Sequence, residues 1–184
     1  MKILLGLTLL LNLYNTITAV NVYEKKNGKY IHWQGEIFGI HNKYRKMHCV
    51  PKLKPIQKIA VTAQKTSKLL CTQKELTHSG NKLYGENLFK AIFPKNFTVD
   101  RHIMVDNAVK AWYSENKFYN YDNPVDNKKS LHFTQLIWKN TVEFGCGLTE
   151  CVFDNHKVIV IACNYSPPGN YRGQFKENVP KPCK

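Results

Sequence analysis

Apolar residues in the first two thirds of the chain recur every three or four positions, which is the spacing of one face of an α-helix. Three such stretches predict helices at about 34–48, 56–71 and 99–117, and a shorter helix is expected at about 131–139. Between the second and third helices, residues 77–88 show no period and contain two glycines. We expect irregular backbone there, lining a site.

The last third of the chain has a different pattern. Residues 144–150 look like a strand, and residues 157–165 carry a run of β-branched side chains that is typical of a buried strand. After Pro167 the sequence is rich in turn residues. Helices followed by a few antiparallel strands predict a single α+β domain built in layers, and 184 residues suit one such domain.

The N-terminal residues do not fit this domain. Residues 1–19 combine a positive start, a short apolar run and a small final residue, which are the marks of a secretory signal peptide. A membrane anchor is the alternative, but a spanning helix needs about 20 apolar residues, and Asn12 and Asn15 interrupt this run. We therefore expect a secreted, extracellular protein with no membrane span, in which an arm (20–32) precedes one domain (33–184).

The net positive charge of the chain bears on the kind of partner that the protein could bind. The formal net charge is +14 at pH 7, and the lysines are scattered rather than clustered. In a secreted chain this pattern favours a solvated surface, with an anionic surface or a host protein as the alternative partner, and it does not favour nucleic acid.

All six cysteines follow the predicted signal peptide. An even number in a secreted chain predicts three disulfides. A zinc site is the alternative, but the sequence contains no Cys-x-x-Cys pair, and sequence alone does not choose the pairing. The cysteines are Cys49, Cys71, Cys146, Cys151, Cys163 and Cys183.

Two sequons for N-glycosylation are present. Asn96 lies in a polar loop after a proline and is a plausible acceptor. Asn164 lies between a cysteine and a proline, so we expect it to be used poorly.

Four residues stand in surroundings that could carry chemistry: His78, Glu86, Glu115 and His132. Two imidazoles and two carboxylates could bind a divalent cation such as zinc. They could equally form a hydrogen-bonded cluster in which each glutamate fixes a histidine tautomer. Spacing alone favours ordinary structural residues, since no His-Glu-x-x-His motif is present. A cysteine nucleophile is not expected, because all six cysteines are predicted to be paired.

Several motifs together carry a resemblance to a known family. HFTQLIW at 132–138 and CNYSPPGN at 163–170 resemble the two signatures of the CAP superfamily of cysteine-rich secretory proteins, antigen 5 and pathogenesis-related 1 proteins. The His41-Asn42 pair, the Gly85–Leu88 segment and the Trp112–Glu115 segment follow the family's order and spacing. The resemblance covers about residues 33–180 and is most similar to the secreted venom-allergen-like branch.

The resemblance implies a three-layer α-β-α sandwich with a central antiparallel sheet. It also implies a cavity lined by the four residues above, in which His78 and His132 bind a divalent cation, often zinc, and Glu86 and Glu115 lie beside them. It implies Cys71–Cys151 and Cys146–Cys163 bridges, which leaves Cys49 and Cys183 as the third pair. Only Lys184 follows Cys183, so the C-terminal module of the cysteine-rich secretory subgroup has no room, which argues against ion-channel block.

The function that the resemblance implies is binding rather than catalysis. Members of the family bind sterols through an aromatic loop and fatty acids in a tunnel between helices, so a sterol or a fatty acid is the expected ligand of a monomer or weak dimer. The aromatic residues around His132 that would contact it are Phe118, Tyr119, Tyr121 and Phe133.

Two alternatives stay open. In one, the protein is a metal-dependent hydrolase in which Glu86 or Glu115 acts as the general base. In the other, it is a module that binds a host partner, and the four polar residues are structural.

Overall fold

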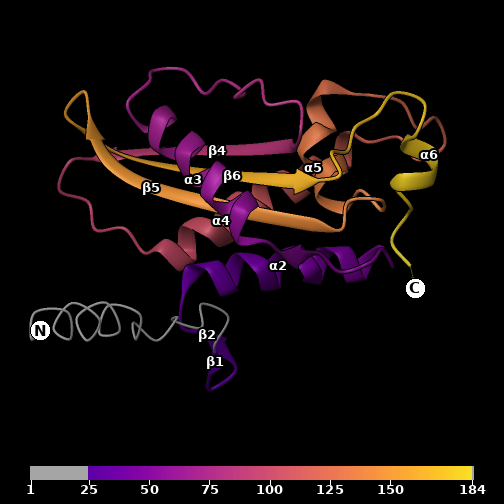
Figure 1. The fold of residues 1–184 in the computed structure, drawn as a ribbon, viewed down its shortest axis with the longest axis horizontal. Coiled ribbons are helices and arrows are strands. Elements are labelled where there is room, and N and C mark those ends of the chain that lie inside the picture. The colour runs from indigo at the N-terminus through magenta and orange to yellow at the C-terminus, as the bar shows by residue number, and fades with distance from the viewer. Residues whose placement is uncertain (1–24, 184) are drawn as a thin grey trace, which may run out of the picture.

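The computed structural model describes residues 25–183 (Figure 1). The predicted signal peptide at 1–19 and the first part of the predicted arm lie outside the described residues. The elements are, in chain order, β1 (Lys25–Lys26), β2 (Lys29–Tyr30), α2 (Trp33–Met47), β3 (Lys54–Pro55), α3 (Gln57–Cys71), β4 (Gly85–Pro94), α4 (Arg101–Ser114), the 3₁₀ helices η2 (Glu115–Phe118) and η3 (Lys128–Ser130), α5 (Leu131–Ile137), β5 (Glu143–Phe153), β6 (His156–Ser166) and α6 (Phe175–Asn178).

The centre of the domain is a four-stranded sheet in the order β3-β5-β6-β4. Strand β6 pairs antiparallel with both β4 and β5 along their length, while the two-residue β3 joins the edge in parallel with the start of β5. The sheet is therefore antiparallel except at this short edge. Asp154 and Asn155 link β5 to β6 with φ of 49° and 59°, the positive values that a tight two-residue hairpin turn requires.

The helices cover both faces of this sheet. Alternate residues of β6 point to opposite sides: Ile159 and Ile161 belong to the core beneath α2, α4 and α5, whereas Val158 and Val160 belong to a second core beneath α3. Figure 1 shows the three long strands side by side with α3 lying across them. The three-layer α-β-α sandwich is thus confirmed.

Helix α3 packs closely on β5 because β5 carries glycines where the two elements meet. A Cβ atom at Gly145 would clash with the backbone of Ala60, and one at Gly147 would clash with the backbone of Gln64. These glycines explain why the Gly-Cys-Gly step of the sequence occurs within a buried strand.

The predicted helices agree with the structure to within three residues at each end, and the third differs most. Asp100 caps the third helix by accepting hydrogen bonds from the backbone N–H groups of His102 and Ile103, so the helix begins at Arg101 rather than at 99. It ends at Ser114, and the predicted last turn is the 3₁₀ helix η2.

The prediction of irregular backbone over 77–88 is wrong from Gly85 onward, where β4 begins. Strand β4 is buried on both faces near its start, at Asn87 and Leu88, so it lacks the alternation of polar and apolar residues that signals a half-buried strand. Residues 77–84 do form a loop.

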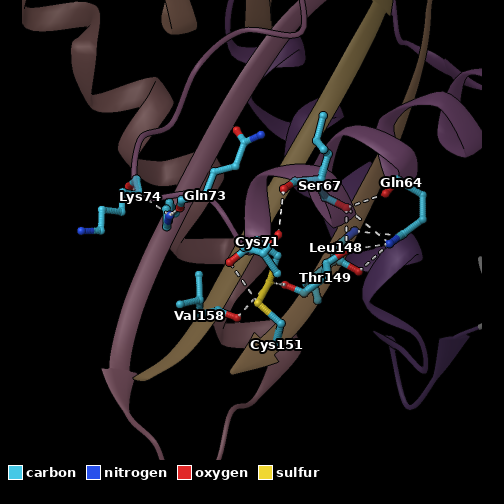
Figure 2. The surroundings of a disulfide bond; sticks show 12 residues. Gln64, Ser67, Cys71, Gln73, Lys74, Leu148, Thr149, Cys151 and Val158 are labelled. Carbon is cyan, nitrogen blue, oxygen red and sulfur yellow. Dashed lines mark hydrogen bonds between the residues drawn. A yellow bond between two sulfur atoms is a disulfide. The ribbon is translucent and has the colours of Figure 1, made fainter. Parts of the chain in front are cut away.

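The three predicted disulfides are present and no described cysteine is free. Figure 2 shows the bridge between Cys71, at the end of α3, and Cys151 on β5. Beside it, Gln64 binds both the N–H and the C=O of Leu148, at 3.1 Å each. The Cys146–Cys163 bridge joins neighbouring residues of β5 and β6, and Cys49–Cys183 ties the C-terminal tail to the end of α2.

Arg45 is a buried cation with no exposed surface. Its position between Lys43 and Lys46 in the sequence would suggest a surface residue. Its guanidinium donates to the carbonyl oxygens of Pro51, Leu136, Trp138 and Thr141 at 2.7–3.1 Å. Burial lowers its pKa to about 10. One side chain therefore joins α2 to the loop before β3 and to the segment that leaves α5.

Within residues 25–183, no helix combines the length and the apolar character needed to cross a membrane.

Candidate functional site

The four polar residues predicted to form a site come from four different elements. His78 lies in the loop after α3, Glu86 is the second residue of β4, Glu115 follows the last residue of α4, and His132 is the second residue of α5. The structure groups them into two histidine–glutamate pairs.

The first pair joins the loop to the sheet. His78 Nδ1 lies 2.9 Å from Glu86 Oε1, which also accepts the backbone N–H of Ser79 at 2.9 Å. The His78 side chain is 64% exposed, whereas that of Glu86 is 8% exposed. The hydrogen bond to Glu86 raises the pKa of His78. Burial alone would raise the pKa of Glu86, but the bonds from His78 and Ser79 outweigh it and lower that pKa.

The second pair joins α5 to the end of α4. Glu115 Oε1 lies 2.7 Å from His132 Nδ1, and its Oε2 accepts the backbone N–H groups of His132 at 3.0 Å and Phe133 at 3.3 Å. Both oxygens of this carboxylate are therefore engaged within the protein.

In both pairs the carboxylate binds Nδ1 of the imidazole. A carboxylate next to Nδ1 favours the proton on that atom, which leaves the lone pair of Nε2 available as a ligand. This arrangement resembles the carboxylate–histidine pairs that orient metal-binding imidazoles.

We call these four residues the tetrad. One cavity of about 440 Å³ is lined by three of them and is called the tetrad cavity. Glu115 lies behind His132 and does not line it. The lining residues are His78, Ser79, Gly80, Asn81, Lys82, Tyr84, Glu86, Asn87, Lys128, Leu131, His132 and Asn170.

Asn87 helps to hold together the elements that form this cavity, a role that the sequence pattern did not indicate. Its Nδ2 donates to the backbone carbonyl of His132 at 3.0 Å and contacts the hydroxyl of Tyr165 at 3.4 Å. It therefore ties the start of α5 to β4, the strand that the sequence pattern did not show.

Within residues 25–183, the structure has one group of three potential ligand residues whose donor atoms all lie within 4.8 Å: His41, Cys146 and Cys163. It is not a metal site, because the two sulfurs form a disulfide. Both ring nitrogens of His41 are also engaged, Nδ1 with the carbonyl of Ile37 at 2.7 Å and Nε2 with the hydroxyl of Tyr165 at 2.9 Å.

Burial lowers the pKa of His41 to about 3, well below its usual 6.5. Because the unfolded chain takes up this proton first as the pH falls, stability is lost below pH 6.5. We expect His41 alone to reduce the free energy of unfolding by about 2 kcal/mol between pH 7 and 5. Urea unfolding at each pH, compared between the wild type and His41→Gln, measures the difference in slope. His156→Gln, which makes the same substitution at an exposed position, is the control for the change of residue type. Equal slopes in all three proteins would contradict the prediction.

The four aromatic residues predicted to contact lipid differ in exposure. Phe118 is 44% exposed, with the ammonium groups of Lys117 and Lys129 at 5.0 and 5.9 Å from its ring centre. Tyr121 is partly buried against Tyr119, whereas Tyr119 and Phe133 belong to the core. Burial raises the pKa of both tyrosines to about 12. Only Phe118 and Tyr121 therefore offer surface to a ligand.

A second hollow, of about 540 Å³, lies between α2 and α4 and is called here the α2–α4 groove. Tyr30 of the β1–β2 hairpin forms one wall, and its ring fills the space where a side chain at position 39 would lie, so Gly39 is needed there. The lining residues are Lys25, Tyr30, Glu36, Phe38, Gly39, Ile40, Asn42, Lys43, Tyr44, Lys46, Lys52, Asp106 and Lys110.

The two glycosylation sequons lie in different surroundings. Asn96 is exposed in the turn after β4. Asn164 is 1% exposed inside β6, so its amide is not accessible in the folded protein. Glycosylation at Asn96 stays a prediction.

The comparisons with known proteins agree with this architecture. The human Golgi-associated plant pathogenesis-related protein 1 is 33% identical over 157 residues, which covers 83% of this chain and 95% of that protein. The structure of BmVAL-1 has the same fold, with a TM-score of 0.69, 23% identity and coverage of 88% of this chain and 90% of the other. The structure of NaASP2 with Zn²⁺ has a TM-score of 0.64, 21% identity and coverage of 87% and 90%.

The family described as the cysteine-rich secretory protein family, CAP, matches residues 38–165. This range contains α2 from Phe38 onward, all of α3, β4, α4, α5 and β5, and nearly all of β6, together with all four tetrad residues. Since the match covers more than half of the chain, the protein belongs to the CAP family.

Proposed function

We propose that this protein is a secreted CAP protein that binds a long-chain fatty acid in the α2–α4 groove. The observation that carries the proposal is the chemistry of the groove, which combines an apolar floor with a rim of lysines. A fatty acid has the matching parts, an alkyl chain and one carboxylate.

The floor comes from α2. Ile40 and Tyr44 are partly buried and pack on the core below, so their remaining surface is available to an alkyl chain. Each CH₂ removed from water contributes about 0.8 kcal/mol. The groove volume of about 540 Å³ is within the range of roughly 300–1,000 Å³ that is usual for small-molecule sites.

The rim is cationic. Five lysines line the groove against two carboxylates, Glu36 and Asp106. Asp106 is paired with Lys110 at 2.6 Å, and no described carboxylate lies within 4.0 Å of the other four lysine ammonium groups. An anionic head group therefore finds unpaired positive charge at the edge of the apolar floor.

Secretion supports an extracellular ligand. Three disulfides are typical of proteins that fold and work in oxidising compartments. The predicted signal peptide at 1–19 agrees with this.

The test is a titration of the delipidated protein with palmitate, followed by tryptophan fluorescence or calorimetry. We expect saturable binding that Lys43→Glu/Lys46→Glu weakens at least tenfold, because the rim then repels the carboxylate. The control Lys58→Glu/Lys65→Glu makes the same charge change on α3, away from the groove, and should stay within twofold of wild type. Absence of saturable binding, or equal loss in both variants, would refute the proposal.

Cholesterol is the comparison ligand in the same experiment. A sterol offers no carboxylate to the lysines, and only Phe118 and Tyr121 of the predicted aromatic residues have surface to contact it. We therefore expect palmitate to bind more tightly than cholesterol.

We also propose that His78 and His132 bind a divalent cation in the tetrad cavity. Their Nδ1 atoms are held by carboxylates, and their Nε2 atoms are left as ligands. A protein of the same fold has been solved with Zn²⁺. When bound, the cation would polarise whichever oxygen ligand completed its coordination.

Glu115→Gln is expected to weaken zinc binding about 10–100-fold, the usual effect of removing a carboxylate that orients a histidine ligand. Competition with a zinc-sensitive dye measures the affinity. Glu75→Gln makes the same change at an exposed position and should leave the affinity unchanged. If Glu115→Gln also leaves it unchanged, His132 is not a ligand.

Hydrolysis finds less support than binding. Catalytic zinc usually has three protein ligands, and the tetrad offers two imidazoles. Both oxygens of Glu115 already accept hydrogen bonds from the protein, and Glu86 is nearly buried. Neither carboxylate is placed to act as a general base.

A further inference from the structure

The two glutamates of the tetrad expose little or no surface to the tetrad cavity. Glu86 is the one acidic residue in the lining, its side chain is 8% exposed, and its Oε1 is shared by His78 and Ser79. Glu115 does not line the cavity. A molecule that enters therefore meets little negative charge.

The cavity rim is positively charged. Lys82 comes from the loop between α3 and β4, and Lys128 comes from η3, so the two residues reach the cavity from separate segments. Both are exposed, and none of the carboxylates in residues 25–183 lies within 4.0 Å of either ammonium.

The loop that carries Lys82 is ordered by its own hydrogen bonds. Ser79 Oγ accepts the backbone N–H of Asn81 at 3.3 Å, and Asn81 Oδ1 accepts that of Leu83 at 2.9 Å. The acceptor atoms of these side chains are thus used inside the loop. The Ser79 hydroxyl hydrogen and the Asn81 amide Nδ2 remain as donors.

Unpaired ammonium groups and donor groups around a concave site are the chemistry that recognises an oxyanion. The volume of about 440 Å³ is larger than a bare ion needs, so it can also admit part of the group that carries the anion. We propose that the tetrad cavity binds a phosphate or sulfate monoester through Lys82 and Lys128. This site is separate from the fatty-acid groove and requires no metal.

The test uses chelator-treated, full-length mature protein labelled with ¹⁵N in a phosphate-free buffer at constant ionic strength. The probes are inorganic phosphate, glucose 6-phosphate and glucose 6-sulfate. We expect saturable amide shifts confined to the two segments 79–83 and 128–132, with tighter binding of the esters than of the free ion. Lys82→Ala/Lys128→Ala should weaken binding at least fivefold.

The control Lys58→Ala/Lys65→Ala removes two exposed lysines from α3 and should stay within twofold of wild type. Both double variants change exposed residues, and matching thermal unfolding curves confirm that they fold. Shifts that do not saturate, that spread over all lysines, that persist in Lys82→Ala/Lys128→Ala or that need added zinc would each overturn the proposal. The palmitate titration involves other lysines, so failure here leaves the fatty-acid proposal standing.

Discussion

Replacement of Arg45 by methionine is expected to lower the free energy of unfolding by about 4 kcal/mol. The guanidinium satisfies four carbonyl oxygens and has no exposed surface. Methionine fills a similar volume but donates no hydrogen bond, so buried carbonyls lose their partner. Each unsatisfied buried group costs about 1–3 kcal/mol.

Urea unfolding followed by far-UV circular dichroism measures this loss. Arg45→Lys retains the charge but not the planar fork, so it should lose about half as much free energy as methionine. Lys43→Met, at an exposed position on the same helix, should stay within about 0.5 kcal/mol of wild type. A stability of Arg45→Met within that same margin would show that the carbonyls find other donors.

Removal of the Cys71–Cys151 bridge is expected to cost about 4 kcal/mol, because the bridge closes a long loop and restricts the unfolded chain. The two cysteines are 80 residues apart in the sequence. Alanine at both positions avoids a new buried polar group beside α3. The hydrogen bonds around the bridge in Figure 2, from Gln64 and Ser67 to β5, should remain in the variant.

The matched comparison is Cys146→Ala/Cys163→Ala, which opens a loop of 17 residues. Chain entropy predicts a smaller loss there, about 3 kcal/mol. Both variants are unfolded in urea under non-reducing conditions. If the shorter bridge costs clearly more than the longer one, packing at the bridge rather than loop entropy controls the stability.

Much of the fold follows from local pattern. The helices were predictable because their apolar residues repeat at helical spacing, and β6 because Val158–Ile161 form an unbroken apolar run. Strand β4 was not predictable in this way, since its buried start contains Glu86 and Asn87, whose partners come from distant segments. Buried polar residues such as Glu86 and Asn87 belong to the site, so this part of β4 lacks the apolar pattern by which ordinary strands are predicted.

The site was predictable only in part. Family motifs indicated His78, Glu86, Glu115 and His132, and the structure adds that each glutamate binds Nδ1 of one histidine. The groove was not visible in the sequence. The groove forms because Tyr30 lies against Gly39 and because lysines of α2 and α4 line the same hollow. Neither arrangement can be inferred from a local sequence pattern.

The two hollows carry different chemistry. The α2–α4 groove combines an apolar floor with lysines, which fits an amphiphile with one negative group. The tetrad cavity is lined mainly by residues with polar side chains and combines two imidazoles with two lysines. A single chain could therefore bind a lipid and a small polar ligand at separate places, and variants of one site should not affect the other.

The most direct test of the central claim is native mass spectrometry of the purified protein without prior delipidation. We expect a species heavier than the polypeptide by one long-chain fatty acid. That species should be lost in Lys43→Glu/Lys46→Glu and retained in Lys58→Glu/Lys65→Glu. A protein that carries no fatty acid and does not take up added palmitate would contradict the claim, as would a bound lipid that remains in the groove variant.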